Sequence, residues 1–345
     1  MKGNQSCPSN VFDIIYVGDC SNKSRRSYAR LDALKKILPS SNFIEINWNP
    51  ENIFFKFVFK IYLKFSLSFL APWYLLLGSL LKKNTIIWVD NFPIFNETSI
   101  KFFKFLKPDL KIIFVSEDNF LLPHNSSKLH LPLLKNYNYI FTTKDFILRE
   151  LGYMNNIFKF YDSFDHRFIS ASRDNNSNEI YHAKNFNITF IGTYEEERYK
   201  HISFLAENNF TVDIFGANWP ETEIENINIH SPIYGDDYEN IIKSSKINLI
   251  FLRKCNFDTV TSRSYEIPYF KNFFLAEYSD DHYELYKNTE ILFRSSEELL
   301  SRVKFWLNKP DNFLDETAQT LYKNVAELDR SIFSETQNII TKIGI

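Results

Sequence analysis

The sequence predicts an α/β fold with two domains, each built on a parallel sheet that helices cover on both faces. Short apolar runs alternate with amphipathic helical stretches, and this alternation occurs in two series separated by a polar stretch. Strands that alternate with helices are joined by crossovers, which makes neighbouring strands parallel. The chain has 345 residues, of which 44% are hydrophobic, so it is long enough to bury two cores.

The first series starts with a strand at 11–17, a loop with Gly18 and an amphipathic helix at 24–38. The segments "TIIWVDNF", "KIIFVSED" and "YNYIFTTK" are predicted strands, and "TSIKFFKFLK" and "KDFILRELG" are predicted helices. Ligands of such sheets bind beyond the carboxyl ends of the strands. Polar residues stand at those ends: Asp19, Asp90, Glu117, Asp118 and Thr142.

An apolar segment at 53–83 lies within the first series and carries three lysines, Lys56, Lys60 and Lys64, at helical spacing. Its uncharged part, 65–81, is shorter than the roughly 20 residues that span a bilayer. A basic amphipathic helix lying in a membrane surface fits this pattern. A pair of buried helices packed on the first sheet, or a short transmembrane helix, are the alternatives.

The stretch 168–186 is polar and lacks periodicity, so we predict a linker there. The second series follows it. The predicted strands are "ITFIGT", "TVDIFG", "INLIFL", "NFFLAE" and "EILFR". The predicted helices include "EEERYKHISFLAEN", "DDYENIIKSSK" and "EELLSRVKFWLN", with a polar-faced helical tail after them.

Composition excludes several classes of protein. A net charge of −2 argues against binding dominated by nucleic-acid phosphates. The cysteines Cys7, Cys20 and Cys255 have no CxxC spacing, so neither a disulfide framework nor a zinc site is expected, and no metal is predicted. The first residues lack the apolar core of a signal peptide, and we expect a cytoplasmic protein.

The stretch "NFDTVTSRSYEIPYFKNFFLAEY" places two acids, Asp258 and Glu266, around Arg263 just before a buried strand. A helix that starts near Thr261 or Ser262, with either as N-cap, offers free N–H groups to a diphosphate. Arg253, Lys254 and Arg263 are the cations that could neutralise it, and Glu266 could accept hydrogen bonds from a ribose. The alternative is an ordinary ion pair between Arg263 and Glu266 on a helix surface.

This stretch, continued through "SDDHYELYKNTEILFRSSEELLSRVKFWL", resembles the C-terminal motif of the CgeB-like glycosyltransferases, roughly T-x-R-[ST]-[FY]-E-I-P-A-x-G, an apolar strand and a later E-E-L. The likeness extends to "ITFIGTYEEERYKHISFL", "VDIFGANW" and "YGDDYENIIKSSKINLIF", and in the first half to "IIYVGD", "YNYIFTTKDFILRELG" and "YDSFDHRF". It covers most of the chain. The family's A-x-G after the proline is "YFKN" here, which leaves the geometry of that turn and the identity of the sugar open.

The resemblance implies a GT-B fold, with two Rossmann-like domains whose parallel sheets face a central cleft. Residues 1–170 would bind the acceptor and 185–310 the nucleotide-sugar donor, while helices in 311–345 would return to the first domain. Glu266 matches the acid that contacts the donor ribose, and Asp258 stands where an E-x7-E pair has its first acid. The implied donor-binding residues are Gly192, Thr193, Tyr194, Arg198, Gly216, Trp219, Arg253, Lys254, Thr261 and Ser262.

The implied activity is metal-independent transfer of a sugar from a nucleotide-sugar donor to a glycan, glycolipid or protein acceptor, in bacterial surface polysaccharide or glycoconjugate assembly. Cations would stabilise the leaving diphosphate. An inverting enzyme also needs a general base, for which Asp19, Asp90, Asp118 and His124 are candidates. We place Asp19 with Asp258, Arg263 and Glu266 as the catalytic set, and expect contact between 53–83 and the inner face of the cytoplasmic membrane.

Two other functions remain open from sequence. A non-catalytic module could keep the fold and recruit glycan enzymes at a membrane, and a sugar-nucleotide epimerase could use the same fold. Detection of transfer or nucleotide hydrolysis separates an enzyme from a module, and product analysis separates a transferase from an epimerase.

Overall fold

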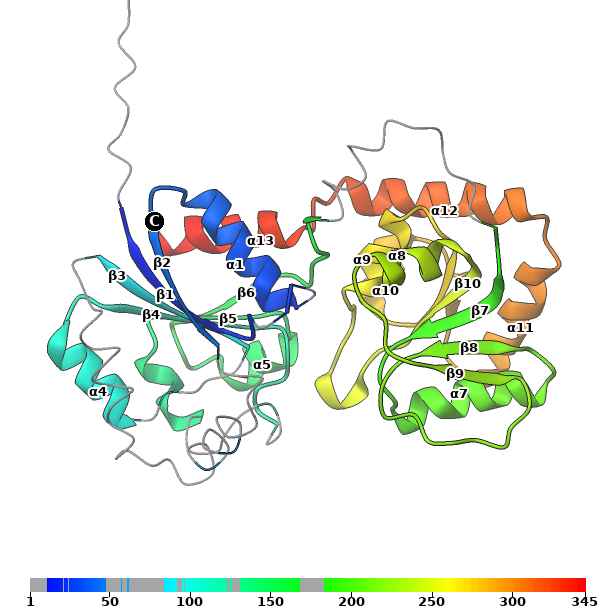
Figure 1. The fold of residues 1–345 in the computed structure, drawn as a ribbon, viewed down its shortest axis with the longest axis horizontal. Coiled ribbons are helices and arrows are strands. Elements are labelled where there is room, and N and C mark those ends of the chain that lie inside the picture. Colours follow the sequence, from blue (N-terminus) through cyan, green and yellow to red (C-terminus); the bar gives the residue numbers. More distant parts are fainter. Residues whose placement is uncertain are drawn as a thin grey trace, which may run out of the picture. The chain divides into compact units, whose positions relative to one another are not determined.

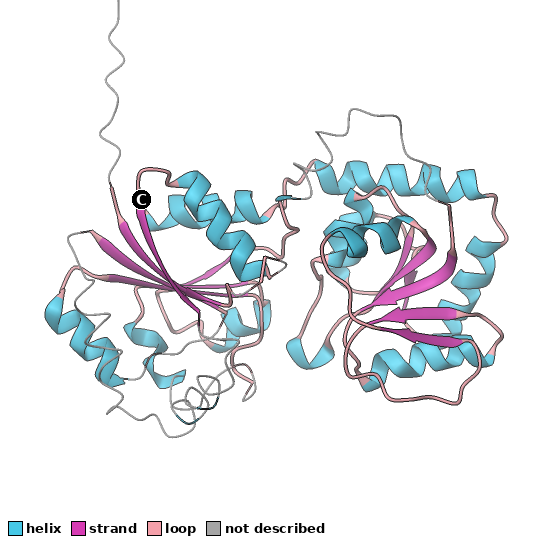
Figure 2. Cartoon of the chain, viewed as in Figure 1, coloured by secondary structure: helices cyan, strands magenta, loops and turns pink. Residues whose placement is uncertain are grey.

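The computed structural model describes residues 11–20, 22, 23, 25–47, 57, 61, 84–91, 95, 97–122, 125, 131–167 and 183–345. The chain divides into two compact units. Unit 1 is Met1–Tyr161 together with Ile332–Ile345, and unit 2 is Asp162–Ser331. Each unit has a parallel sheet with helices packed on it, as Figures 1 and 2 show. The predicted α/β class with two parallel sheets is confirmed.

The described part of unit 1 contains a parallel six-stranded sheet in the order β2-β1-β3-β4-β5-β6. Its strands are β1 (Asp13–Gly18), β2 (Asn42–Asn47), β3 (Thr85–Asp90), β4 (Lys111–Ser116), β5 (Tyr139–Thr142) and β6 (Ile157–Lys159). Its helices are α1 (Arg26–Ile37), α4 (Glu97–Leu106), the 3-10 helix η1 (Leu131–Asn136), α5 (Asp145–Glu150) and α13 (Ile332–Ile343).

The central strands of unit 1 are buried on both faces, which explains why their sequences are continuous apolar runs. Alternate residues go to opposite sides of the sheet. Ile15 and Val17 pack in a cluster with α4 and α5, whereas Ile14 and Tyr16 pack in another with α1 and α13. Figure 1 shows α1 and α13 on one face of the sheet and α4 on the other.

The described part of unit 2 contains a parallel six-stranded sheet in the order β12-β11-β10-β7-β8-β9. One hydrophobic cluster joins this sheet to its helices. The strands are β7 (Phe186–Ile191), β8 (Val212–Phe215), β9 (Ile227–His230), β10 (Ser245–Ile250), β11 (Phe274–Glu277) and β12 (Leu292–Phe293). The helices are α7 (Glu196–Glu207), α8 (Asp236–Lys243), the 3-10 helix η2 (Lys254–Asn256), α9 (Arg263–Tyr269), α10 (Asp280–Tyr286), α11 (Ser296–Leu307) and α12 (Asp311–Ala326).

The two C-terminal helices belong to different units, which differs from the predicted return of the whole range 311–345. Helix α12 stays in unit 2, because its apolar residues, among them Leu314 and Leu321, are part of that unit's core. Helix α13 crosses back and buries Ile339, Ile340 and Ile343 against the sheet of unit 1.

Three strands, β2, β6 and β9, were not predicted. All three are partly exposed. In β2 and β9 polar residues interrupt the apolar ones, and β6 has only three residues, so none shows the continuous apolar run of the central strands. The predicted membrane contact of 53–83 lies outside the described residues apart from Phe57 and Ile61, and His124 also lies outside them. Within the described part of the chain, we find no helix with the length and apolar character needed to span a bilayer.

Candidate active site

The loops that follow β7 and β8 meet at the carboxyl edge of the sheet in unit 2. The Gly192 amide donates to the Phe215 carbonyl at 2.9 Å, and the Tyr194 amide donates to the Ala217 carbonyl at 3.0 Å. A Cβ on Gly216 would lie 1.8 Å from the Gly192 carbonyl oxygen, so only glycine allows this approach. The structure therefore brings together Gly192 and Gly216, two of the predicted donor-binding residues, and their role in binding stays a prediction.

Aromatic side chains pack beside this glycine pair. The Trp219 indole donates from Nε1 to the Gly192 carbonyl at 2.8 Å. Its ring lies 5.5 Å from the ring of Tyr194 and 5.9 Å from that of Phe190, both in edge-to-face geometry. The tryptophan thus fixes the position of the loop that carries Thr193, an exposed residue.

Three arginines from different segments share this edge: Arg198 on α7, Arg253 after β10 and Arg263 at the start of α9. Arg198 is buried, and its Nη1 donates to the Thr193 carbonyl at 3.0 Å. Burial lowers the pKa of Arg198 to about 10; Glu195 opposes this shift, and the charges of Arg263 and Arg253 add to it. The guanidinium groups are therefore close enough to repel one another.

Glu195 is a member of this cluster that the sequence reasoning missed. Its carboxylate accepts from Arg253 Nε at 2.7 Å and lies 3.7 Å from Arg198 Nε. The missed signal was an acid immediately after the Gly-Thr-Tyr loop in "FIGTYEEER". Among the residues that the structure describes, Nε of Arg198 and Nε of Arg263 are buried without a hydrogen-bond partner.

Lys254 is held at the same edge by an acid at the end of β11. Glu277 lies 3.2 Å from Lys254 Nζ and accepts from the Leu252 amide at 3.0 Å. Burial lowers the pKa of Lys254, but Glu277 and Glu197 outweigh it and raise the pKa above its ordinary value. Lys254 is thus a protonated cation whose side chain is mostly exposed.

Glu266 lies within α9 and is buried. It accepts a hydrogen bond from the Tyr238 hydroxyl of α8 at 2.6 Å. The surface ion pair considered between Arg263 and Glu266 is absent from the contacts of the described residues. Glu266 is therefore oriented by a tyrosine that the sequence reasoning did not include.

The start of α9 differs from the predicted cap. Ser262 already has helical backbone angles and makes no side-chain capping bond. Instead, the Ser264 hydroxyl accepts from the Thr261 amide at 3.0 Å. Asp258 lies in the preceding loop and accepts from Asn256 Nδ2 at 2.8 Å.

A buried histidine ties α9 to the neighbouring strand. His282 Nδ1 lies 2.7 Å from the Glu277 carbonyl, and Nε2 lies 2.7 Å from the Ser264 hydroxyl. Since a carbonyl only accepts, Nδ1 carries the proton and Nε2 accepts from Ser264. Burial lowers the pKa of His282 to about 4, against the opposing effect of the hydrogen bond that its Nδ1 donates to the Glu277 carbonyl. His282 is therefore neutral, and in that form it fixes the position of the segment that carries Arg263 and Glu266.

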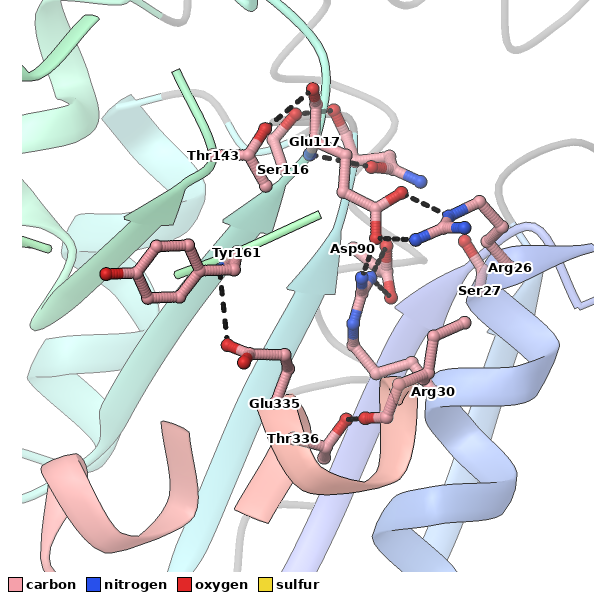
Figure 3. Close-up of polar contacts among 12 residues, drawn as sticks. Arg26, Ser27, Arg30, Asp90, Ser116, Glu117, Thr143, Tyr161, Glu335 and Thr336 are labelled. Carbon is pink, nitrogen blue, oxygen red and sulfur yellow. Dashed lines mark hydrogen bonds and ion pairs between the residues drawn. The ribbon is translucent and has the colours of Figure 1, made fainter. Parts of the chain in front are cut away.

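The carboxyl edge of the sheet in unit 1 carries a different set of charges, drawn in Figure 3. Arg30 of α1 is buried, and its Nη1 donates to both carboxylate oxygens of Asp90 at 2.7 Å. Its Nη2 donates to Glu117 at 2.5 Å, and Arg26 donates to the same carboxylate. The Tyr16 hydroxyl donates to Asp90. These contacts join β1, β3, β4 and α1.

Pairing determines the protonation of this network. Burial disfavours the ionised carboxylate of Glu117, but Arg26 and Arg30 outweigh it and lower its pKa to about 2. A carboxylate with such a pKa is a poor proton acceptor at neutral pH. Asp90, which is one of the candidate bases, is fully buried in its contacts with Arg30 and Tyr16, so it is not accessible to an acceptor.

Asp19 follows β1 at the same edge and lies 3.5 Å from Arg25 Nε. It is a residue of unit 1, whereas the other predicted site residues all belong to unit 2. Its assignment to the catalytic set stays a prediction. In the described residues, no group of three or more His, Cys, Asp or Glu side chains could hold a metal ion.

Comparison with known proteins indicates the class of protein that carries this site. Residues 198–327 match the family model described as "Glycosyl transferase-like". These residues include all but the first two of α7, the whole of α9, and the three arginines Arg198, Arg253 and Arg263. No curated protein matches the chain in sequence. The predicted glycosyltransferase class is confirmed at this level.

Several solved structures share the fold. OtsA in its apo form has a TM-score of 0.65 and 11% identity, covering 96% of this chain and 99% of that chain. A UDP-forming α,α-trehalose-phosphate synthase from Burkholderia xenovorans, in complex with glucose-6-phosphate, has a TM-score of 0.62 and 9% identity, covering 96% and 99%. An α-glucosyltransferase in complex with UDP and a 13-mer DNA has a TM-score of 0.61 and 11% identity, covering 96% and 100%. The predicted GT-B fold is confirmed.

Proposed function

We propose that the protein transfers a sugar from a nucleoside-diphosphate donor bound at the carboxyl edge of the sheet in unit 2. The observation that carries this proposal is the pair of buried Nε groups, on Arg198 and Arg263, that lack hydrogen-bond partners among the described residues. A buried donor without an acceptor is unfavourable, and crowding of like charges adds to the cost. A diphosphate supplies both acceptor oxygens and negative charge, which relieves both penalties.

The remaining contacts fit the other parts of such a donor. Glu266, with one carboxylate oxygen already accepting from Tyr238, is suited to receive ribose hydroxyl hydrogens. Lys254 and the loop of Gly192 and Thr193 lie at the same edge as the arginines and complete the phosphate side. The α-glucosyltransferase that shares the fold was solved with UDP, which supports this class of donor.

In the proposed reaction, the bond between the anomeric carbon and the β-phosphate oxygen breaks, and an acceptor oxygen forms the new bond to that carbon. The arginines stabilise the charge that develops on the diphosphate, with no metal required. If the reaction inverts the anomeric centre, the acceptor's proton goes to a carboxylate of unit 1, for which Asp19 is our candidate. Asp258, on the loop before α9, would face the sugar.

The acceptor in this proposal is a glycan, a glycolipid or a protein in bacterial surface polysaccharide or glycoconjugate assembly. The resemblance to CgeB-like enzymes belongs to the proposal, as does a cytoplasmic location on the inner face of the membrane. The trehalose-phosphate synthase that shares the fold was solved with glucose-6-phosphate, which supports a sugar as acceptor.

Binding of nucleoside diphosphates tests the proposal. Isothermal titration with UDP, GDP, dTDP, CDP and ADP should find one that binds, and Arg263→Gln should weaken its affinity at least about tenfold, the loss of one charge-assisted contact. Glu266→Gln should weaken binding as well. Arg149→Gln on α5, an exposed arginine of unit 1, is the matched control and should bind as the wild type does.

The two possible failures have different meanings. If no nucleotide binds, a non-catalytic module becomes the better account of the fold. If one binds equally well to the wild type and to Arg263→Gln, the site lies elsewhere. Product analysis with the matching nucleotide sugar then separates transfer from epimerisation.

A further inference from the structure

The outer side of α4 and the end of η1 form a basic hollow on unit 1. Its volume is about 530 Å³, and its lining includes the lysines Lys101, Lys104 and Lys135, the acid Glu97 and the ring of Phe105. This hollow lies away from the carboxyl-edge residues described above, and no step of the proposed reaction uses it.

The pattern of α4 explains why these side chains face outward. Ser99, Ile100 and Phe103 are buried against the sheet of unit 1. Lys101, Lys104 and Phe105 are spaced i, i+3 and i+4, so they share the opposite side of the helix. Phe105 is 81% exposed, and Leu106 beside it is 44% exposed. A large ring in this position gains nothing from the core of its own unit.

The charges of the hollow are unbalanced. Lys101 pairs with Glu97 at 2.6 Å. The pKa of Glu97 is lowered by its hydrogen bond with Lys101 and the charge of that lysine, and Lys135 contributes too. Within the described residues, Lys104 and Lys135 have no ion pair. The three lysines against one acid leave an excess of two positive charges beside an exposed aromatic side chain.

We propose that this α4 surface, made of Lys101, Lys104, Phe105, Leu106 and Lys135, docks on a bilayer that carries anionic headgroups. Lysines gain from the negative surface potential of such a bilayer. Exposed aromatic and aliphatic side chains gain from entering the boundary between headgroups and acyl chains. A nucleic acid or an anionic peptide would satisfy the lysines but not Phe105 and Leu106, so a lipid surface fits the whole set best. The inference uses no residue of the donor site, and it deepens the membrane location that is part of the proposed function.

Vesicle binding of the full chain tests the proposal. We would measure co-sedimentation with vesicles of phosphatidylcholine alone and of phosphatidylcholine with phosphatidylglycerol. The wild type should bind the anionic vesicles, and the paired variant Lys104→Glu/Lys135→Glu should lose at least about tenfold in partition coefficient, since each lysine near such a surface contributes measurably. Phe105→Ser should weaken binding several-fold while leaving every charge in place.

The matched control is Lys304→Glu/Lys323→Glu, which makes the same charge change at exposed lysines of α11 and α12. It should retain more than half of the wild-type binding. The proposal is overturned if the wild type ignores anionic vesicles. It is also overturned if the α4 variant binds like the control, which would place the contact on another segment such as 53–83. Unchanged binding of Phe105→Ser, or equal competition by soluble glycerol phosphate, would reduce the hollow to an anion site and overturn docking on the bilayer.

Discussion

The carboxyl edges of the two sheets both carry arginines and acids, but they differ in how completely the arginine donors are paired. In unit 1, the charge of Arg30 meets Asp90 and Glu117, and the charge of Arg26 meets Glu117. In unit 2, Glu195 faces Arg253 and Arg198, but the Nε groups of Arg198 and Arg263 are buried without a hydrogen-bond partner among the described residues. The proposed diphosphate would supply the acceptors that these two donors lack. The comparison therefore sets an edge whose arginines pair with acids of the fold beside an edge that keeps two arginine donors for the proposed ligand.

The largest expected effect comes from breaking the neutralised edge. Asp90→Asn removes the charge that faces buried Arg30, and removal of one partner of a buried pair typically costs about 3–5 kcal/mol. The free energy of unfolding of unit 1 should fall by this amount in urea titrations, followed by hydrogen exchange of peptides from β1 and β3. The control is Asp145→Asn, whose partner Lys159 lies 2.6 Å away on the surface and should contribute less than about 1 kcal/mol. Equal, small losses in both variants would contradict a structural role for the unit 1 network.

The second prediction is that the two units lose stability in different pH ranges. An unfolded histidine binds a proton near pH 6.5, whereas folded His282 does so only near pH 4. The stability that neutral His282 contributes is therefore complete above pH 6.5 and is lost as the pH falls to 4. The shift corresponds to about 3 kcal/mol. In unit 1, Glu117 has a pKa of about 2, below its unfolded value near 4.3. Its contribution to stability is therefore lost only as the pH falls from about 4.3 to about 2.

Hydrogen exchange at several pH values tests whether unit 2 loses stability at a higher pH than unit 1, because peptides from the two units are measured separately. Unit 2 should weaken between pH 6.5 and 4 while unit 1 keeps its network contribution. His282→Gln removes the titrating group and should flatten this dependence in unit 2, whatever its own effect on stability. If the stability of unit 2 in the wild type stays constant across that pH range, His282 does not stabilise the unit through its neutral form.

The smallest expected effect concerns the binding of a nucleotide at the edge of unit 2. Tyr238→Phe keeps the ring packed near Phe270 but removes the donor to Glu266. A lost hydrogen bond of about 1 kcal/mol should lower the affinity for the nucleoside diphosphate that binds about fivefold. Affinity for the 2′-deoxy form of that nucleotide should change less, because it lacks one hydroxyl that an oriented Glu266 would hold. Tyr153→Phe, at a residue 80% exposed, is the control. The same loss for both nucleotides would show that Tyr238 serves only the packing.

The alternation of apolar runs was sufficient to predict the central strands and the helices between them. It missed β2 and β9 because edge strands such as "NFIEIN" and "INIH" are only partly buried. The pattern of acids and arginine in one contiguous stretch indicated Arg263 and Glu266, and the resemblance added Arg198. It could not supply the pairing of Arg30 with Asp90 and Glu117. Those partners are 60 and 87 residues apart, so no local pattern links them.

The return of α13 to unit 1 makes the order of synthesis matter. The 170 residues from 162 to 331 that form unit 2 leave the ribosome before the segment that completes unit 1. At ordinary translation rates of about 5–20 residues per second, this delay lasts about 10–35 s. During that time the side of the sheet that carries Ile14 and Trp88 lacks Ile339, Ile340 and Ile343. Unit 2 can therefore finish folding first. Until the final helix arrives, the apolar surface of unit 1 has to be protected by chaperones or covered by rapid completion of the chain.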